Sequence, residues 1–384
     1  MADPEGFIVC YNQDPHVCHG LYIAVMPLHL LQIFRSQVTQ DHLDYTASLH
    51  DHPGVELYGP GDLAAFLRQD ATHSIAVVDL DHFDWPANRT LLARLRPCHR
   101  VIVRSHEYGQ EYEAIMRDHD LANFEWITCS APPLRHARHT PSQDWLLSTA
   151  HPYFHEPAFV ATRWQERLSP DRERDHTFEV MLGRPKPHRD LCRRWVTANV
   201  PARHYLMSDP LVGDTTFDQL PEDSVFREPE MKTDPDNYTV DYLGRRTWQS
   251  MVLPIRLYEK TQHSVVCETL TDVCFPTEKT CKPIMAQRLF VVLSCQGYLA
   301  HLRGLGFRTF HGIIDESYDS VPDDAARWTQ ALEQMRSLVD RPWPELWPQL
   351  RPVVEHNLQH LRALPTQVLL DRVRHALDPR HVES

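Results

Sequence analysis

The stretch "SVVCETLTDVCFPTEKTCKPIMAQRLFVVLS" (264–294) decides the fold of the second half of the chain. Apolar runs over 264–269 and 288–294 are typical of strands, and the pattern between them, over 277–287, is typical of a helix. A strand, a helix and a second strand in this order form a βαβ unit, in which the two strands are parallel. The stretch therefore predicts an α/β fold.

Strand and helix patterns continue on both sides of this stretch. An apolar strand pattern precedes it over 177–182. After it we expect a short strand over 307–310, and helices over 297–306, 323–340, 344–362 and 365–377. The segment 209–250 is rich in Asp, Pro, Thr and Gly, and is expected to be a long irregular excursion.

The first half shows the same alternation. Strands are expected over 6–12, 74–80, 100–105 and 124–130, and helices over 62–69, 87–97 and 111–121. The apolar segment 21–38 fits either class. Strands that alternate with helices indicate a second doubly wound α/β unit.

The length of 384 residues fits two domains of about 150–200 residues each. The polar segment 168–177 contains a proline and separates two periodic regions. We therefore predict domains over 1–170 and 171–345, followed by C-terminal helices over 346–384 that can pack back on the first domain.

Composition and charge exclude several classes of protein. A hydrophobic content of 42% with 24% charged residues is that of a globular chain, and a net charge of −13 argues against a general binder of the nucleic-acid backbone. A local basic groove is still compatible with this charge. No apolar run reaches the roughly 18 residues that a membrane helix needs. We expect a cytoplasmic protein without a membrane span.

Cysteine and histidine spacing does not indicate a metal site. The nine cysteines include no CxxC pair, and the 25 histidines include no HExxH pair. Cys267, Cys274 and Cys281 recur every seven residues, but they fall on a predicted strand, loop and helix. Reduced, partly buried thiols are the better interpretation, and no metal or cofactor is predicted.

The helix that begins at residue 278 has features of an anion site. Thr277 can cap it, Glu278 and Lys279 occupy its first turn, and Lys282 follows one turn later. A helix N-terminus carries a positive dipole end that suits a pyrophosphate, and a nearby carboxylate can accept the two hydroxyls of a ribose. Alternatively, Glu278 and Lys279 are ordinary solvated charges.

A second group of cations follows the strand at 177–182. In "MLGRPKPHRD" (181–190) a glycine permits a sharp turn after Leu182, and Arg184 follows it. Open α/β sheets bind ligands at the carboxyl ends of their strands, and an arginine there can bind phosphate oxygens through two hydrogen bonds. The two prolines stiffen the turn. These residues predict a phosphate-binding turn.

The segment 264–310, together with "IIDESYD" after it, resembles the donor-binding half of the fucosyltransferase-like glycosyltransferases. It is most similar to uncharacterised members that phages and bacteria encode. The resemblance covers roughly residues 178–320 and includes the "TEK" helix and the small-residue strand that follows it. It implies the GT-B fold, in which two Rossmann-like doubly wound domains face each other across a cleft.

The resemblance also implies residue roles. Glu278 resembles the ribose-binding glutamate of this family, Lys279 its pyrophosphate lysine, and Arg184 its donor-phosphate arginine. Where the family usually has "FEN", this chain has "CET" (267–269), and Glu268 of this motif is placed in the donor site. The departure leaves the identity of the sugar, and GDP-fucose in particular, open.

Polar residues follow three predicted strands of the first half. Asp14, His82 and Glu107 are the candidates for the base that deprotonates an acceptor hydroxyl, because parallel strands end at one edge of a sheet. Glu107 is favoured because the family resemblance implies a carboxylate. Each of the three is equally compatible with a turn or capping role.

These features predict a glycosyltransferase that uses a nucleotide diphosphate sugar as co-substrate and has a glycan or a hydroxymethylated DNA base as acceptor. Metal-independent transfer is expected, although Asp79 and Asp81 form a DxD pattern. The alternative is a non-catalytic nucleotide-sugar-binding protein. A nicotinamide or flavin oxidoreductase is disfavoured, because no GxGxxG follows a predicted strand.

Overall fold

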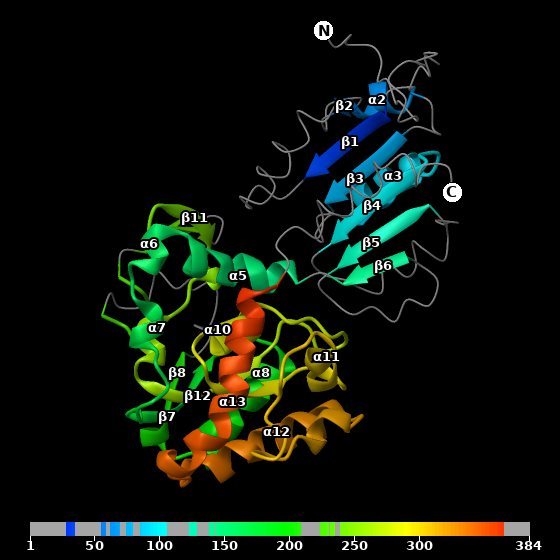
Figure 1. Cartoon of the computed structure of the whole chain (residues 1–384). Helices are drawn as coiled ribbons and strands as arrows, with labels where there is room; N and C mark the ends of the chain where they lie inside the picture. The colour runs from blue at the N-terminus through cyan, green and yellow to red at the C-terminus, as the bar shows by residue number, and fades with distance from the viewer. Residues whose placement is uncertain are drawn as a thin grey trace, which may run out of the picture.

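The computed structural model describes most of the second half of the chain and parts of the first. The described residues are 28–34, 55–58, 62–69, 74–79, 85–105, 123–128, 138–141, 143–208, 223–229, 231–234 and 239–364. Two parallel sheets lie in separate parts of the molecule (Figure 1), and a small antiparallel sheet is also present.

The first sheet has the strand order β2-β1-β3-β4-β5-β6, and all of its neighbouring strands are parallel. Its strands are β1 (Leu28–Phe34), β2 (Val55–Tyr58), β3 (Ser74–Asp79), β4 (Arg100–Ser105), β5 (Phe124–Thr128) and β6 (Arg138–Pro141). Helices α2 (Leu63–Phe66) and α3 (Trp85–Leu95) connect strands of this sheet. The chain adds β2 on one side of β1 and β3 to β6 on the other, so the strand order reverses between β1 and β3, as in a doubly wound fold.

The predictions for this sheet are confirmed where the structure describes it. The strands expected over 74–80, 100–105 and 124–130 are present, as are the helices expected over 62–69 and 87–97. The apolar segment 21–38, whose class stayed open, contains β1. The strand expected over 6–12 and the helix expected over 111–121 lie outside the described residues.

Strand β6 was not expected from the sequence. Its four residues, "RHTP", are mostly polar and end in a proline, which cannot donate to a neighbouring strand. Proline is confined to the edges of sheets, and β6 is an edge strand. Neither its composition nor its length distinguishes it from a loop.

The second sheet has the order β13-β12-β7-β8 and is also entirely parallel. Its strands are β7 (His176–Met181), β8 (Tyr205–Ser208), β12 (Thr261–Cys267) and β13 (Leu289–Leu293). From β7 the chain moves to β8 on one side and later returns to place β12 on the other side. The point between β7 and β12 is therefore a topological switch point, where such sheets bind ligands.

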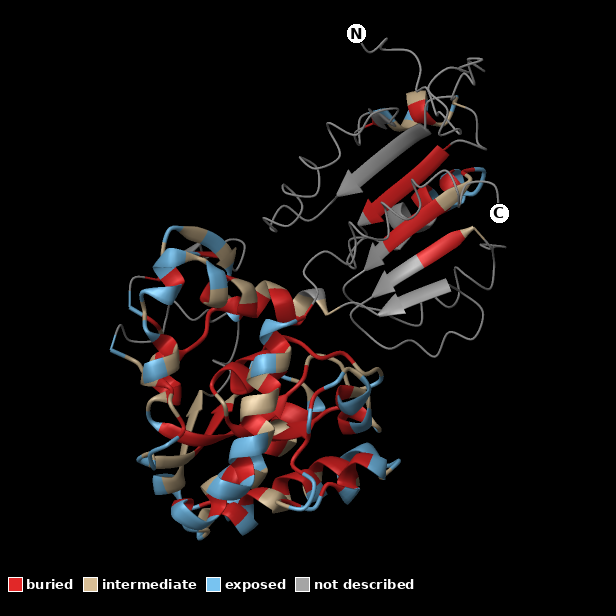
Figure 2. Ribbon diagram, in the orientation of Figure 1, coloured by how far each residue is buried: buried red, intermediate tan, exposed pale blue. Residues whose placement is uncertain are grey.

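Helices cover both faces of the second sheet (Figure 1). Helix α12 (Asp324–Val339) packs against α8 (Pro187–Asn199) and β13, whereas α10 (Glu278–Met285) packs against α5 (Asp144–His155), α13 (Trp343–Arg362) and β12. Both β12 and β13 are buried along their whole length (Figure 2). Burial on both faces explains why these strands are continuous apolar runs in the sequence.

The core of the second sheet includes residues that precede the predicted domain boundary near residue 170. Leu146 and Ala150 of α5, and Trp164 of α7 (Trp164–Arg167), belong to the same buried cluster as Val180 of β7. The short helix α6 (Pro157–Val160) lies between them and contributes Phe159. The elements that pack around the second sheet therefore begin with α5. The division of the chain into domains near residue 170 stays a prediction.

A three-stranded antiparallel sheet forms within the predicted irregular excursion at 209–250. It consists of β9 (Lys232–Asp234), β10 (Thr239–Tyr242) and β11 (Arg245–Trp248). Leu243 and Gly244 both have positive φ, 53° and 80°, which is the conformation of a type I′ hairpin turn. The segment is therefore partly regular. Pairing between its own strands satisfies main-chain N–H and C=O groups, although the amino-acid composition of the segment does not indicate strands.

The remaining elements are short. They are α9 (Ile255–Tyr258), α11 (Tyr298–Gly304) and three 3-10 turns, Ala202–His204, Gln249–Met251 and Ser317–Ser320. The helices expected over 297–306, 323–340 and 344–362 are confirmed by α11, α12 and α13. The last expected helix, 365–377, lies outside the described residues.

The strand expected over 307–310 is wrong. Phe307 and Phe310 are buried in the core, which explains the apolar pattern. The main chain at Arg308 has no strand partner; its N–H donates to Oδ1 of Asn357 (2.7 Å), and its carbonyl accepts from Nδ2 of Asn357 (2.8 Å). One side-chain amide from α13 thus satisfies the groups that a neighbouring strand would satisfy.

Both parallel sheets therefore have the Rossmann-like α/β character that the sequence predicts. The arrangement of two domains around a cleft, as in GT-B enzymes, stays a prediction. No helix in the described part of the chain combines the length and the apolar character that crossing a membrane requires.

Candidate functional site

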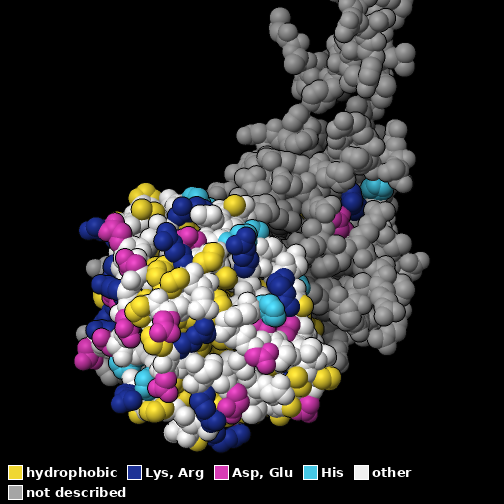
Figure 3. Space-filling model, turned by 60° about the horizontal axis from the view of Figure 1, so that its bottom comes forward, with side chains coloured by type: hydrophobic (Ala, Val, Ile, Leu, Met, Phe, Trp, Pro, Cys, Tyr) yellow, Lys and Arg dark blue, Asp and Glu magenta, His cyan; other side chains and the backbone are white. Residues whose placement is uncertain are grey.

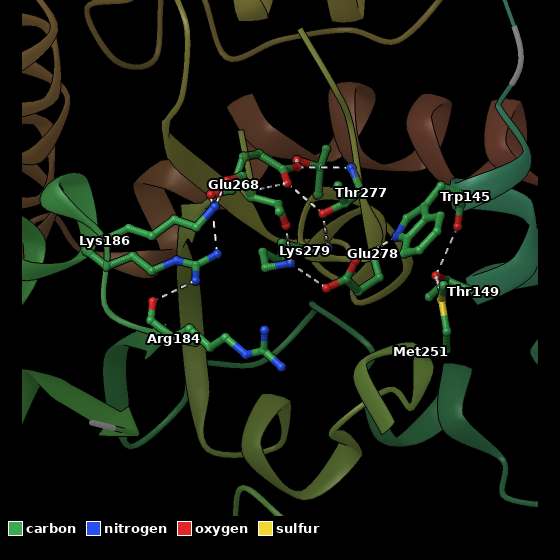
Figure 4. A network of polar contacts seen from close by, with 12 residues as sticks. Trp145, Thr149, Arg184, Lys186, Met251, Glu268, Thr277, Glu278 and Lys279 are labelled. Atoms are coloured by element: carbon green, nitrogen blue, oxygen red, sulfur yellow. Dashed lines mark hydrogen bonds and ion pairs between the residues drawn. The ribbon is translucent and has the colours of Figure 1, made fainter. Parts of the chain in front are cut away.

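The candidate site lies at the switch point of the second sheet, where β7 and β12 end. The turn after β7 contains Gly183, Arg184 and Lys186, and the loop after β12 begins with Glu268 and Thr269. Parallel neighbouring strands bring these two segments to the same edge of the sheet. Figure 4 shows the side chains that both segments contribute.

Arg189, in the first turn of α8, holds the turn after β7 in place. Its side chain is buried; Nη1 donates to the carbonyl of Arg184 (2.8 Å) and Nη2 to the carbonyl of Glu268 (3.4 Å). Burial lowers the pKa of Arg189. A Cβ atom at Gly183 would lie 3.1 Å from Nη1 of Arg189, so any larger residue would have to displace this buried guanidinium by a few tenths of an ångström.

Two further contacts join the same segments. Nζ of Lys186 donates to the carbonyl of Thr269 (2.6 Å), and Nε2 of His188 lies 2.9 Å from the carbonyl of Glu268. Burial lowers the pKa of His188 to about 4, so the imidazole is neutral at neutral pH and donates through Nε2–H. The turn after β7 and the loop after β12 are thus linked by several hydrogen bonds.

Glu268 connects the end of β12 to the start of α10. Its carboxylate is fully buried and accepts hydrogen bonds at both oxygens. Oε1 accepts from the Thr277 N–H (3.1 Å) and from the hydroxyls of Thr280 (2.7 Å) and Tyr298 (2.7 Å). Oε2 accepts from the Thr277 hydroxyl (2.5 Å) and from the Thr269 N–H (3.3 Å).

These contacts define what Glu268 does in this structure. Because its oxygens are buried and bonded to protein groups, the side chain positions the helix start instead of facing solvent. The sequence analysis placed Glu268 in the donor site, whereas in the structure both carboxylate oxygens are bonded to protein groups between β12 and α10. Its replacement would leave several buried donors without an acceptor, each of which costs about 1–3 kcal/mol.

Thr277 is the N-cap of α10, as the sequence predicts. Its hydroxyl oxygen accepts from the N–H of Lys279 (3.3 Å) while the hydroxyl donates to Glu268. The cap is buried. The positive end of this eight-residue helix therefore has a fixed position at the switch point, close to the turn that contains Arg184.

Glu278 and Lys279 form an ion pair in the first turn of α10. Oε1 of Glu278 accepts from Nζ of Lys279, and Oε2 accepts from Nε1 of Trp145 (2.6 Å). Burial raises the pKa of Glu278, but the charges of Lys279 and Lys282 outweigh burial and lower it to about 2. Lys279 also donates to Oγ1 of Thr269 (3.0 Å).

Trp145 is a site residue that the sequence did not indicate. It lies in the first turn of α5 and stands on the opposite side of Glu278 from Lys279 (Figure 4). Glu278 is only 3% exposed, so a ribose that reaches its carboxylate must replace the hydrogen bond from Trp145 or that from Lys279. The interpretation of Glu278 and Lys279 as solvated charges does not hold for Glu278.

Lys282 is a buried cation one turn further along α10. It is 8% exposed, and burial lowers its pKa to about 8, although the charges of Glu278 and of Glu179 on β7 act in the opposite direction. Among the described residues, no side chain or carbonyl forms a hydrogen bond or an ion pair with its amino group. A charged amine in this position is stabilised by an anion that binds next to it.

Arg184 is exposed and lies in the turn after β7. In Figure 4 its side chain extends from this turn in the direction of Glu278 and Lys279. The two segments for which the sequence predicts phosphate contacts are thus brought together by the fold. Arg184 and Lys279 give this edge of the sheet two cationic side chains, and Lys282 adds a positive charge one turn further along α10.

The predicted base candidates are not described by the structure. Asp14, His82 and Glu107 lie outside the described residues. No group of three or more potential metal ligands occurs among the residues that are described. Cys281 donates to the carbonyl of Leu146 (3.3 Å) on α5, so the seven-residue spacing of cysteines does not bring three thiols together.

Comparison with known proteins does not assign the chain to a family. No protein-family model matches it, and no curated protein is significantly similar to it. The likeness to fucosyltransferase-like enzymes therefore stays a prediction, and the functional argument depends on the geometry of the site.

Proposed function

We propose that this protein is a glycosyltransferase that moves a sugar from a nucleotide diphosphate sugar to a hydroxyl acceptor. The observation that supports it most strongly is the hydrogen-bonded connection at the switch point. Through Arg189 and Glu268, the turn that contains Arg184 is joined to the N-cap of α10 at Thr277. Two separate phosphate-binding features thereby point to one ligand.

In this proposal the pyrophosphate of the donor binds between Arg184 and the start of α10. Arg184 binds phosphate oxygens through two hydrogen bonds, while Lys279 and Lys282 contribute formal positive charges and α10 its dipole. Glu278 accepts hydrogen bonds from the ribose hydroxyls, which replace the hydrogen bond from Trp145. Glu268 positions these groups without touching the donor.

The transfer forms a bond between the acceptor oxygen and the anomeric carbon, and it breaks the bond between that carbon and the diphosphate. A base takes the proton of the acceptor hydroxyl; Glu107, Asp14 and His82 remain the candidates. Negative charge develops on the leaving diphosphate, and Arg184 with the start of α10 stabilises it. These groups can do so without a metal ion, so we propose metal-independent transfer.

The charge pattern favours a glycan acceptor over a DNA base. On the face of the second part shown in Figure 3, lysine and arginine side chains are interspersed with acidic ones, and the whole chain has a net charge of −13. A DNA acceptor would need a continuous basic surface and binding that weakens steeply with salt. Binding of duplex DNA at low salt that disappears at higher salt would reverse this preference.

A non-catalytic nucleotide-sugar-binding protein is the second candidate. It is favoured by the burial of Glu278, whose carboxylate already has two partners within the protein, Trp145 and Lys279. The two candidates make different predictions, because a binding protein is stabilised by nucleotide sugars but does not release a nucleoside diphosphate from them.

A panel of nucleotide sugars tests the proposal. We expect one of them to raise the melting temperature and, with a suitable hydroxyl acceptor, to release its nucleoside diphosphate, and we expect this release to persist in EDTA. Arg184→Ala and Lys279→Ala should each remove about 2–4 kcal/mol of transition-state stabilisation, or about 10²–10³-fold in rate. Arg194→Ala, an exposed arginine on α8, is the matched control and should leave turnover unchanged. Full turnover in both site variants would refute the assignment.

A further inference from the structure

Two cysteines lie in contact beside the candidate site. Cys274 is in the loop between β12 and α10, and Cys295 follows the end of β13. Their Sγ atoms are 3.1 Å apart. A disulfide bond is about 2.05 Å long, so a shift of about 1 Å converts this contact into the bond.

The surroundings hold both cysteines in place. The carbonyl of Ser294, next to Cys295, accepts from Nε and Nη2 of Arg327 and from Nε1 of Trp328. Phe275, next to Cys274, is buried and contacts the ring of Trp145 at a centroid distance of 5.9 Å. The close approach of the two thiols is therefore a property of the packed fold.

The two thiols differ in reactivity. Cys274 is partly exposed, whereas the other cysteines among the described residues are buried. The hydrogen bond between the thiols lowers the pKa of Cys274 and raises the pKa of Cys295. Since the thiolate is the nucleophile in disulfide exchange, Cys274 is the attacking residue and Cys295 the resolving one.

We propose that Cys274 and Cys295 form a reversible disulfide that ties the loop between β12 and α10 to the end of β13. A low-molecular-weight disulfide, RSSR, is the oxidant. The Cys274 thiolate attacks one of its sulfurs and expels RS⁻; the Cys295 sulfur then attacks Cys274 and expels the second RS⁻. The protein thiols lose two electrons and two protons, and two molecules of RSH are formed.

The bond would fix a loop that serves the candidate site at both of its ends. Thr269, at the start of the loop, receives hydrogen bonds from Lys186 and Lys279, and Thr277, at its end, caps α10. Oxidation would therefore restrict the movement of the groups around the start of α10. The pairing itself depends only on the geometry of the two thiols and not on the proposed function.

Equilibration of the full chain with graded ratios of oxidised to reduced glutathione tests this proposal. After alkylation and digestion, we expect a peptide in which Cys274 and Cys295 are linked. As the ratio becomes more oxidising, this peptide should appear before any other disulfide-linked peptide. Alkylation after unfolding should find two fewer free thiols, and the oxidised protein should melt at a higher temperature. Recovery of both residues as separately alkylated peptides at every ratio would overturn the proposal.

Single variants separate a specific pair from general thiol reactivity. In Cys295→Ser, Cys274 should retain one glutathione as a mixed disulfide, because the resolving thiol is absent. In Cys274→Ser, buried Cys295 should stay unmodified. Cys98→Ser, in the core of the other sheet, is the control and should form the same linked peptide as the unaltered chain. A link from Cys274 to a cysteine other than Cys295 would refute the assignment.

Discussion

Replacing Lys282 with methionine is expected to make the free protein more stable and its binding of a nucleoside diphosphate weaker. Burial lowers the pKa of Lys282 from 10.5 to about 8. This difference corresponds to about 3 kcal/mol against the charged form in the folded chain at neutral pH. Methionine has a similar length and no charge, so Lys282→Met should raise the free energy of unfolding by up to about 3 kcal/mol at pH 7.

The sign of the pH dependence follows from the direction of this shift. Below pH 8 the lysine is charged in both the folded and the unfolded chain, and its destabilising contribution is complete. Between pH 8 and 10.5 the unfolded chain binds more protons than the folded one, so stability rises with pH and the contribution disappears. Lys282→Met should lose this rise in urea unfolding measured across that window.

Binding of a diphosphate next to Lys282 should restore the ordinary pKa of its amine. At pH 8 about half of the free chains carry a neutral lysine, so binding should take up about half a proton, and affinity should fall about fourfold between pH 7 and pH 8.5. Titration calorimetry in two buffers of different ionisation enthalpy measures this uptake.

The matched control for this experiment is Arg194→Met, which removes an exposed positive charge from α8. It should change neither the affinity nor the proton uptake. If Lys282→Met binds the nucleoside diphosphate as tightly as the unaltered chain, and the unaltered chain takes up no proton, Lys282 does not contact the donor.

Three further substitutions test other groups of the candidate site. Between pH 6 and pH 3 the Glu278 carboxylate should lose about 2 kcal/mol of its stabilising contribution, because its pKa is about 2 in the folded chain and 4.5 in the unfolded one. In Glu278→Gln the free energy of unfolding should therefore fall by about 2 kcal/mol less over this pH range than in the unaltered chain. Urea midpoints at both pH values measure the difference. Trp145→Phe keeps the aromatic packing but deletes the hydrogen bond to Glu278, so nucleotide-sugar affinity should rise if this bond competes with the ribose, and an unchanged or lower affinity in a binding titration would contradict that competition. Gly183→Ala should destabilise the chain by about 1–3 kcal/mol, since its Cβ would lie 3.1 Å from the buried Arg189 guanidinium; a thermal unfolding midpoint equal to that of the unaltered chain would show that the turn relaxes freely.

The strands and helices of the second half could be predicted because their signals are local. Burial of β12 and β13 on both faces demands uninterrupted apolar runs, and the Thr277 cap is visible one residue before its helix. The same local signals placed Arg184 after the strand that ends near Leu182, and Thr277 at the start of its helix. The turn that contains Arg184 is hydrogen-bonded to the loop that leads to Thr277, and the binding of one diphosphate by both segments stays a prediction.

The contacts that shape the site could not be predicted in the same way. Trp145 reaches Glu278 from 133 residues away in the sequence, and Arg189 resembles an ordinary helix-surface arginine until its contacts with Arg184 and Glu268 are known. The apolar pattern at 307–310 was misleading, because it indicated a strand. The main chain of Arg308 is instead hydrogen-bonded to the Asn357 side chain, and not to a neighbouring strand. In each case the deciding partner is distant in sequence.

A crystal structure of the full chain with a bound nucleoside diphosphate tests the central claim most directly. We predict that both phosphates lie within hydrogen-bond reach of the Arg184 guanidinium and of the first turn of α10, with Lys279 turned from Glu278 toward them. Phosphates bound elsewhere on the molecule, or no bound nucleotide at saturating concentration, would contradict the claim that these two segments form one donor site.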